Sequence, residues 1–274
     1  MCRWLAYSGN PVYLDDIITK PEHSLIDQSL HSYAGATTTN GDGFGLGWYA
    51  RGDEPGVYKS IHPAWNDNNL RALAEQIKSP LFMAHIRATT GSPVQESNCH
   101  PFKFSNWMFV HNGAIRGFPE IKRDLVMAIS PQLYPHIQGS TDSETMFFLA
   151  LSFGMADDVA QGVARMAGFI EQVGAEKGID NPVQMSLGIC DGQSLYAFRY
   201  STEGESRSLF YSIDMEALRQ IAPHLEDFSD DARAVVSEPL SDLAEAWLPV
   251  PESSFLTVKS GEVECQDFIP QQPR

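Results

Sequence analysis

The order of strand-like and helix-like segments constrains the fold of this chain more than any other feature of its sequence. Apolar alternation predicts strands at 4–9, 44–50, 56–61, 81–90, 107–115, 183–201, 208–213, 233–240 and 254–268. Helical spacing covers 15–33, where Pro21 interrupts it, and 66–79, 119–129, 141–155 and 158–178. Runs of strands therefore flank a central run of helices. This order favours an α+β domain with largely antiparallel sheets over a repeating βαβ Rossmann pattern.

Charge and composition narrow the possible functions. The formal net charge of −16 repels nucleic acid backbones and anionic membrane surfaces, so we exclude a nucleic-acid function. The first twenty residues lack a basic segment followed by an apolar one, and no run of eighteen apolar residues occurs. We therefore expect a soluble, cytoplasmic protein with no membrane partner.

The cysteines and histidines do not indicate a disulfide framework or a metal site. No C-x-x-C pair occurs among the four cysteines, so we expect free thiols at Cys2, Cys99, Cys190 and Cys265. No two of the nearby candidates His85, Cys99, His100 and His111 stand at a recognised zinc spacing. We therefore expect no bound metal.

The chain begins MCRWLAYSG, which places a thiol directly before an apolar and aromatic run. A cysteine at a chain end is usually frayed, but a buried strand beginning beside it would hold Cys2 in place. Removal of Met1 would leave Cys2 with both a thiol and a free α-amine. These two groups are a nucleophile and a base, which makes Cys2 a candidate catalytic residue.

Arg87 lies near the end of the strand predicted at 81–90, and a polar loop through Asn98 and His100 follows. An arginine in this position either ties down the loop or offers its planar fork to a small carboxylate. The second interpretation implies a carboxylate substrate.

Two further polar segments each allow a structural and a catalytic interpretation. Asn112-Gly113 is the commonest hairpin dipeptide, yet an asparagine amide beside an unhindered glycine N–H also forms a pair of oxyanion donors. Ser140, Thr141 and Asp142 precede a predicted helix, where such residues act as N-caps and favourable first-turn acids.

A glycine-rich stretch does not match a nucleotide-binding loop. Gly41, Gly43, Gly45 and Gly47 recur at every second residue and fit neither G-x-G-x-x-G nor a P-loop. The spacing favours a turn into a strand at a place where another backbone passes closely.

In their order along the chain, these segments resemble the class II glutamine amidotransferases. That family combines an N-terminal cysteine, an R-x-x-T strand, an H-N-G turn and an acidic S/T-D-S-E segment, which here read MCRW, RATT, VHNG and STDSE. The stand-alone YafJ-like members also share MCRWLAY, DGFGLGWY, NCHPF and SEPL. This group is similar to EgtC, the γ-glutamyl amidohydrolase of ergothioneine synthesis, and to the amidotransferase-like subunit of a yeast glutathione-degrading complex.

The resemblance covers nearly the whole chain and implies an N-terminal nucleophile (Ntn) hydrolase fold, a four-layer αββα sandwich of two mainly antiparallel sheets. We therefore expect a single domain over 1–265. The Pro-rich C-terminal segment predicts a loose tail over 266–274.

The resemblance also implies a reaction and a role for each site residue. Cys2 would form a γ-glutamyl thioester from glutamine or a related γ-glutamyl amide, without a cofactor. The implied partners of this reaction are Asn112 and Gly113 for the oxyanion, Arg87 and Thr90 for the substrate α-carboxylate, and Asp142 for its α-ammonium. One departure is Ala88, where many amidotransferases have tryptophan or tyrosine, so we expect a different pocket wall.

Several biological roles remain open on this evidence. The chain is either a self-contained γ-glutamyl hydrolase, which the sequence favours, an ammonia donor to a separate acceptor enzyme, or a non-catalytic γ-glutamyl-binding subunit. An Ntn amidase for apolar acyl groups would also begin with cysteine, but it would not explain Arg87 together with Asp142. The sequence does not indicate the oligomeric state.

Overall fold

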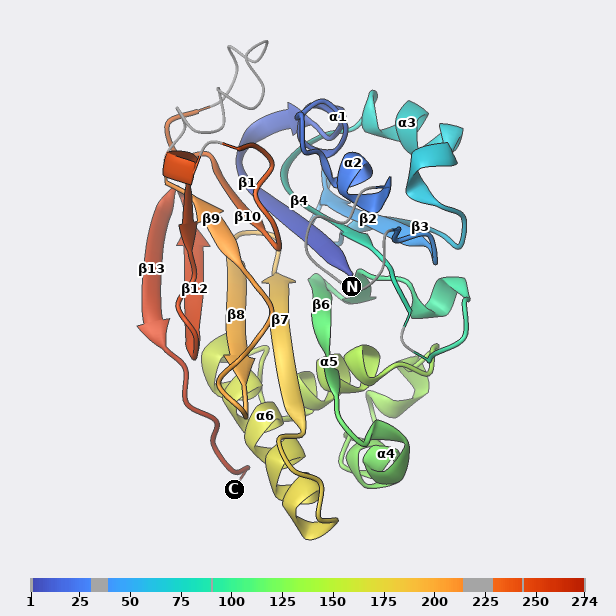
Figure 1. The fold of residues 1–274 in the computed structure, drawn as a ribbon, viewed down its shortest axis with the longest axis vertical. Helices are drawn as coiled ribbons and strands as arrows, with labels where there is room; N and C mark the ends of the chain where they lie inside the picture. Colours follow the sequence, from blue (N-terminus) through green and yellow to red (C-terminus); the bar gives the residue numbers. More distant parts are fainter. Residues whose placement is uncertain (1, 31–38, 90, 214–228, 243, 274) are drawn as a thin grey trace.

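Two antiparallel sheets form the centre of the protein (Figure 1). The computed structural model describes residues 2–30, 39–89, 91–213, 229–242 and 244–273. The first sheet has the strand order β11 (Trp247–Pro249), β9 (Phe210–Ser212), β10 (Arg233–Val236), β1 (Arg3–Tyr13), β4 (Lys78–Ile86), β2 (Phe44–Tyr49) and β3 (Gly56–Ser60). The second has the order β13 (Glu262–Asp267), β12 (Ser254–Lys259), β8 (Leu195–Ser201), β7 (Val183–Cys190), β6 (Trp107–Ile115) and β5 (Phe102–Phe104).

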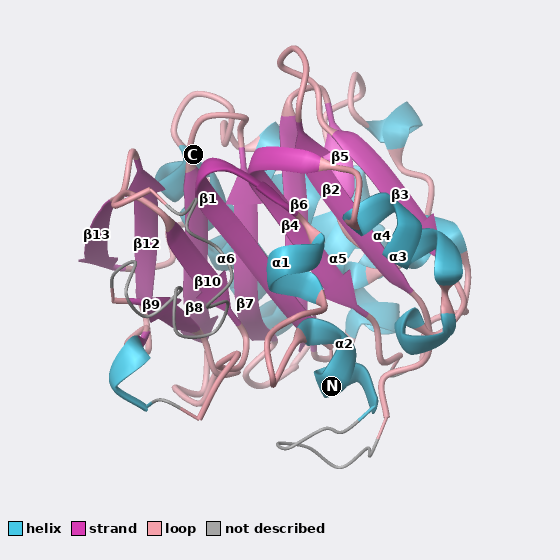
Figure 2. Ribbon diagram, turned by 90° about the horizontal axis from the view of Figure 1, so that it is seen from above, coloured by secondary structure: helices cyan, strands magenta, loops and turns pink. Residues whose placement is uncertain are grey.

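Helices cover the outer face of each sheet. Figures 1 and 2 show α1 (Asp15–Ile18), α2 (Leu25–Leu30) and α3 (Asn68–Ala74) on the first sheet. The helices α4 (Phe118–Met127), α5 (Asp142–Ser152) and α6 (Val159–Glu176) cover the second. No helix in the described part of the chain has the length and apolar character needed to cross a membrane.

Three apolar clusters separate the resulting four layers. In the first cluster, Ile17 of α1 and Leu70 of α3 pack with Phe82 of β4. The second cluster lies between the sheets and includes Trp4 and Met108. The third joins the second sheet to its helices through contacts such as the stacked rings of Phe109 and Phe147, whose centroids are 5.2 Å apart. The predicted α+β class and the four-layer αββα arrangement are therefore confirmed.

Most elements follow the predicted patterns, but the short strands β5 and β11 have no counterpart among the predicted strands, and two further segments differ in detail. The region 15–33 forms the two short helices α1 and α2 up to Leu30, and its last three residues lie outside the described ranges. The segment 107–115 is one continuous strand, β6, so Asn112-Gly113 is not a hairpin turn.

The C-terminal segment differs from the prediction of a loose tail over 266–274. Strand β13 continues to Asp267, and Phe268 is only 3% exposed within the third cluster. Beyond it, the Gln271 N–H donates to the Ala164 carbonyl of α6 at 2.9 Å. Gly168 of α6 permits this approach, since a Cβ there would lie 2.2 Å from the Gln271 carbonyl oxygen. The tail is thus anchored by Phe268 and, at Gln271, by the backbone of α6.

Candidate active site

Cys2 lies directly before β1, opposite the end of β4. Arg3 pairs with Ile86, and the half-buried Cys2 Sγ lies 3.4 Å from both the backbone N and the carbonyl O of Ala88. Burial raises the pKa of the thiol, the Ala88 backbone contact and the Arg87 charge lower it, and the Asp142 charge raises it further. The thiol is therefore protonated at rest, and a nucleophilic role requires a base to remove its proton.

Strand β10 and the residues after it hold the start of β1. The Trp4 N–H donates to Ser237 Oγ at 2.7 Å, and the Ser237 N–H donates to the Trp4 carbonyl at 2.9 Å. Arg3 forms a 2.5 Å ion pair with Glu238 and also donates to the Cys2 carbonyl at 3.0 Å. The side chain of Arg3 is 2% exposed and that of Glu238 12%. These contacts fix the backbone on which Cys2 stands.

Ser237 and Glu238 belong to the SEPL segment of the resemblance, but their role in holding β1 was not predicted from the sequence. The sequence did contain a signal for this role, because a polar pair directly after a buried strand needs hydrogen-bond or ion-pair partners. The identity of those partners depends on the pairing of β1 with β10.

Arg87 follows β4, with its side chain folded into the loop that comes next. Its Nη2 donates to Ser92 Oγ at 2.7 Å and to the Pro93 carbonyl at 3.0 Å, and the residue is 3% exposed. Nη1 has only a 3.5 Å contact to the Asp42 carbonyl. Arg87 thus ties down its loop while keeping guanidinium donors that are not strongly engaged by the described residues. Thr90, the other predicted carboxylate ligand, lies outside the described residues.

The glycine-rich stretch at 41–47 is joined to this loop by hydrogen bonds of Asp42. Asp42 Oδ2 accepts a hydrogen bond from the Thr89 N–H at 2.8 Å, and the Asp42 N–H donates to the Arg87 carbonyl at 3.2 Å. At Gly45 a Cβ would lie 2.0 Å from the His100 carbonyl oxygen, so only glycine lets the two backbones approach. The predicted close passage of another backbone is therefore confirmed.

Asn112 lies within β6 on the face directed toward the first sheet. Met108 and Val110, at even positions of the same strand, belong to the cluster between the sheets, and strand alternation places Asn112 with them. Its register partner Ser186 accepts a hydrogen bond from Trp4 Nε1 at 3.3 Å, which links this position to β1. Asn112 is 5% exposed, and its amide forms no hydrogen bond with any residue that the structure describes.

Gly113 follows Asn112 and is paired with Met185 of β7. A Cβ at this position would lie 2.0 Å from the Gln184 carbonyl oxygen and 2.5 Å from His111 Nε2. Any side chain here would therefore separate β6 from β7.

Asp142 is the first residue of α5, and Thr141 is the N-cap, accepting from the Glu144 N–H at 3.1 Å. The Asp142 carboxylate accepts from the Ile115 N–H and from the Ser143 N–H, both at 2.8 Å. The predicted capping role thus belongs to Thr141, whereas Asp142 joins the helix to the end of β6. Each carboxylate oxygen keeps a lone pair for a further donor.

Three buried histidines lie beneath the site. His111 Nδ1 is 2.8 Å from Ser143 Oγ and Nε2 is 3.2 Å from the Gln184 carbonyl, so Nε2 carries the proton and Nδ1 accepts from the serine. The rings of His85 and His100 lie 4.1 Å apart. Burial lowers the pKa of all three histidines. Within the described ranges, no group of three or more His, Cys, Asp or Glu side chains is arranged to hold a metal ion.

Known proteins match nearly the whole length of this chain. Residues 16–273 match the family described as glutamine amidotransferases class-II. The chain is 35% identical over 302 residues to the probable glutamine amidotransferase DUG3 of Saccharomyces cerevisiae, covering 98% of this chain and 85% of that protein. It is also 33% identical over 123 residues to the γ-glutamyl-hercynylcysteine sulfoxide hydrolase of Mycolicibacterium smegmatis, covering 42% of this chain and 52% of that protein.

Solved structures show the same fold. A glutamine aminotransferase class-II domain protein from Silicibacter pomeroyi superposes with a TM-score of 0.75 at 33% identity, covering 98% of this chain and all of that one. The glutamine phosphoribosylpyrophosphate amidotransferase of B. subtilis shares the fold alone, with a TM-score of 0.66 at 17% identity over 99% of this chain and 50% of that one. This chain therefore belongs to the class II glutamine amidotransferases.

Proposed function

We propose that the protein hydrolyses the γ-amide of glutamine or of a related γ-glutamyl compound through a thioester on Cys2. The observation that carries this proposal is the position of Cys2 Sγ, 3.4 Å from the backbone of Ala88, the residue after Arg87. The Arg87 charge lowers the pKa of this thiol and the Asp142 charge raises it, so a cation and an anion both lie near enough to act on the proposed nucleophile. An α-amino acid carries the two complementary charges.

Catalysis begins with proton transfer from the thiol. Once Met1 is removed, the α-amine of Cys2 has an unperturbed pKa of roughly 7.7–8.0 and can accept the thiol proton near neutral pH. The thiolate then attacks the δ-carbonyl carbon, forming a C–S bond and a tetrahedral oxyanion. Collapse breaks the C–N bond, and the leaving amine takes the proton from the α-ammonium of Cys2. Water hydrolyses the thioester in the second half of the reaction.

The surrounding residues bind the substrate and stabilise the oxyanion. The unengaged amide of Asn112 and the N–H of Gly113 serve as oxyanion donors. Arg87 binds the α-carboxylate with help from Thr90, and Asp142 accepts from the α-ammonium through its remaining lone pairs. Ala88 supplies a small wall beside the thiol.

The choice between glutamine and a larger γ-glutamyl compound is open to direct measurement. One relative is named as a hydrolase of a γ-glutamyl compound and another as a probable glutamine amidotransferase, and both names are compatible with this site. We favour a self-contained hydrolase. A protein that supplies ammonia to a separate enzyme would act on glutamine alone and would respond to that partner.

The test is glutamate release from glutamine, glutathione and a series of γ-glutamyl amides. We expect at least one compound to be hydrolysed by the wild-type protein, and we expect Cys2→Ala to abolish the release. Cys265→Ala, which changes an exposed thiol on β13, is the matched control and should retain full activity. Release that persists in Cys2→Ala would overturn the proposal.

A further inference from the structure

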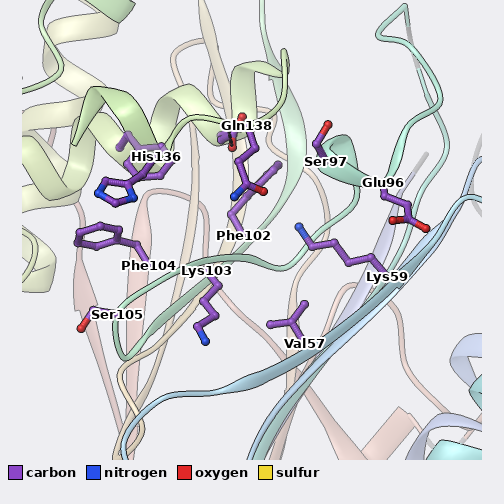
Figure 3. A pocket seen from close by; sticks show the side chains of 12 residues that line it. Val57, Lys59, Glu96, Ser97, Phe102, Lys103, Phe104, Ser105, His136 and Gln138 are labelled. Carbon is purple, nitrogen blue, oxygen red and sulfur yellow. Dashed lines mark hydrogen bonds between the residues drawn. The ribbon is translucent and has the colours of Figure 1, made fainter. Parts of the chain in front are cut away.

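A cavity of about 620 Å³ lies between β3, β5, the turn at Glu96–Asn98 and the start of α5 (Figure 3). None of its lining residues is Cys2, Arg87, Asn112 or Asp142. The proposed reaction therefore does not account for this cavity.

Lys59 provides the cation of the cavity. Figure 3 shows its ammonium directed into the centre, near the Gln138 amide and the ring of Phe102. Lys59 Nζ lies 5.1 Å from the centroid of that ring and forms no hydrogen bond or ion pair with any residue that the structure describes. Burial lowers the pKa of Lys59, against the raising effect of Cys99, Glu144 and Glu96. A bound anion would offset this desolvation of the ammonium.

The other charged groups of the cavity limit the charge of an occupant. Lys103 is paired with Glu54 at 3.2 Å. Glu144 accepts from the Gln138 N–H at 2.9 Å and the Gly139 N–H at 2.7 Å. Among the described lining residues, Lys59 thus offers an ammonium without an ion pair. Glu96 and Glu144 repel any anion, and because this repulsion grows with the charge of the anion, contact with Lys59 favours a monoanion over a dianion.

Aromatic rings form the remaining wall. Phe102, Phe104 and Phe148 line the cavity, and the Phe104 ring packs edge-on against His136 at 5.0 Å and against Phe148 at 6.1 Å. Such rings favour a flat apolar body. A carboxylate on this body can bind Lys59 and the Gln138 amide.

The wall of the cavity is connected to the loop that holds Arg87. Ser97 lines the cavity, and Asn98 beside it donates to the Pro93 carbonyl at 2.9 Å. The same carbonyl accepts from Arg87 Nη2 at 3.0 Å. A molecule packed against Ser97 therefore contacts the segment that positions the arginine.

We propose that this cavity is a regulatory site for a small monocarboxylate with a flat apolar body, and that its occupation stabilises the Arg87 loop. The first part concerns binding only. The second part rests on the proposed function, in which Arg87 binds the substrate α-carboxylate.

The binding test uses calorimetric titration of the full chain with benzoate, benzamide and phenyl phosphate. We expect benzoate to bind at least about 10-fold more tightly than the neutral amide or the dianion, because only benzoate matches the single unpaired cation. Lys59→Met should weaken benzoate binding by about 10-fold or more. Lys78→Met is the matched control, since Lys78 also places its ammonium over a ring, that of Tyr13 at 4.6 Å, away from the cavity. Equal affinity of benzoate in all three proteins, or benzamide binding as tightly as benzoate, would overturn the site.

The coupling test measures the KM for the hydrolysed γ-glutamyl substrate with and without benzoate. We expect a lower KM at unchanged kcat in the wild type and in Lys78→Met, and no effect in Lys59→Met. A raised KM in all three proteins would show competition at Arg87 and would overturn the coupling. Absence of hydrolysis would count against the proposed function while leaving the binding result intact.

Discussion

Asn112 is the residue whose side chain most directly separates a catalytic from a structural role. It is buried on the inner face of β6, and its amide is not used by the described part of the protein. An oxyanion donor acts chiefly on the transition state, so Asn112→Ala should lower kcat by about 100- to 1,000-fold with little change in KM. Steady-state kinetics measure both constants. Asn68→Ala on the exposed start of α3 is the control, and unchanged turnover in Asn112→Ala would remove this residue from the mechanism.

Asp142 has a structural role in the present structure, and a second role in binding is a separate prediction. Asp142→Asn should raise the KM for substrates with a free α-ammonium much more than for N-acetylated analogues, because only the former carry the positive charge. Thermal unfolding of the variant reports the loss of the contacts to Ile115 and Ser143. An equal rise in KM for both substrate series would leave Asp142 only its structural role.

The buried histidines predict a dependence of stability on pH. Burial lowers the pKa of His85 to about 3 and also lowers those of His100 and His111 from the ordinary value of 6.5. Below about pH 6.5 the unfolded chain therefore binds protons that the folded protein excludes, so stability is greatest above this pH and is lost as the pH falls toward 3. Each excluded proton contributes a slope of roughly 1.4 kcal/mol per pH unit.

Urea unfolding between pH 4 and pH 7 measures this slope. We expect His85→Gln to reduce the slope of the unfolding free energy against pH by the contribution of about one proton, roughly 1.4 kcal/mol per pH unit, because the glutamine does not titrate. His62→Gln, at an exposed position, should leave the slope unchanged. A slope in His85→Gln equal to that of the wild type would contradict the assignment.

At the level of the elements, the attachment of β1 to β10 determines the position of Cys2, the proposed nucleophile. Ser237→Ala leaves the buried Trp4 N–H without its 2.7 Å acceptor. We expect a loss of about 1–3 kcal/mol in the free energy of unfolding, and a lower kcat because the start of β1 is held less firmly. Urea denaturation and kinetics on the same sample measure the two effects. Ser241→Ala, which loses only a 3.4 Å contact from Trp247 Nε1, is the control, and an unfolding free energy equal to that of the wild type would refute the prediction for Ser237.

Elements with a strong local pattern were predictable, and those that depend on distant neighbours were not. Within the predicted segment 183–201, the β7–β8 hairpin turns at Asp191-Gly192, because Asp191 Oδ1 accepts from the N–H groups of Gln193 and Ser194 within the turn itself. The C-terminal segment has a Pro-rich composition that indicates a loose tail. In the structure, Gln271 of this segment packs against α6 where Gly168 lets its backbone approach closely, and no local pattern reveals this contact.

For the molecule as a whole, the proposed reaction depends on the state of the chain end. Met1 lies outside the described residues. If Met1 is retained, the nitrogen of Cys2 is an amide and cannot act as a base near neutral pH, so we expect activity to follow the fraction of chains that begin at Cys2. Intact-mass analysis beside a glutaminase assay, with and without methionine aminopeptidase treatment, measures both quantities. Full activity in chains that keep Met1 would refute the N-terminal nucleophile.

A glutamine-like electrophile gives an independent measurement of the same prediction. It should label Cys2 and spare the buried Cys99 and Cys190 as well as the exposed Cys265. Cys265 is the internal control, because labelling by exposure alone would favour it over the half-buried Cys2. Labelling confined to another cysteine would contradict the role of Cys2.

Local sequence patterns were enough to predict the type and order of most elements, the antiparallel α+β class and the chemical groups proposed for the site. Periodicity and turn chemistry are local properties, so they can be recognised without knowing how the chain packs. The order of MCRW, RATT, VHNG and STDSE was enough to indicate the family.

The positions and contacts of these groups depend on the folded chain as a whole. It places Asn112 inside a strand rather than at a turn, holds Arg87 in its own loop, and joins Asp142 to the end of β6. It also brings Ser237 onto Trp4 across a separation of 233 residues. The physical reason is that strand pairing and close backbone approach at glycines act between distant segments, and no segment carries in its own pattern the identity of the neighbour it will contact.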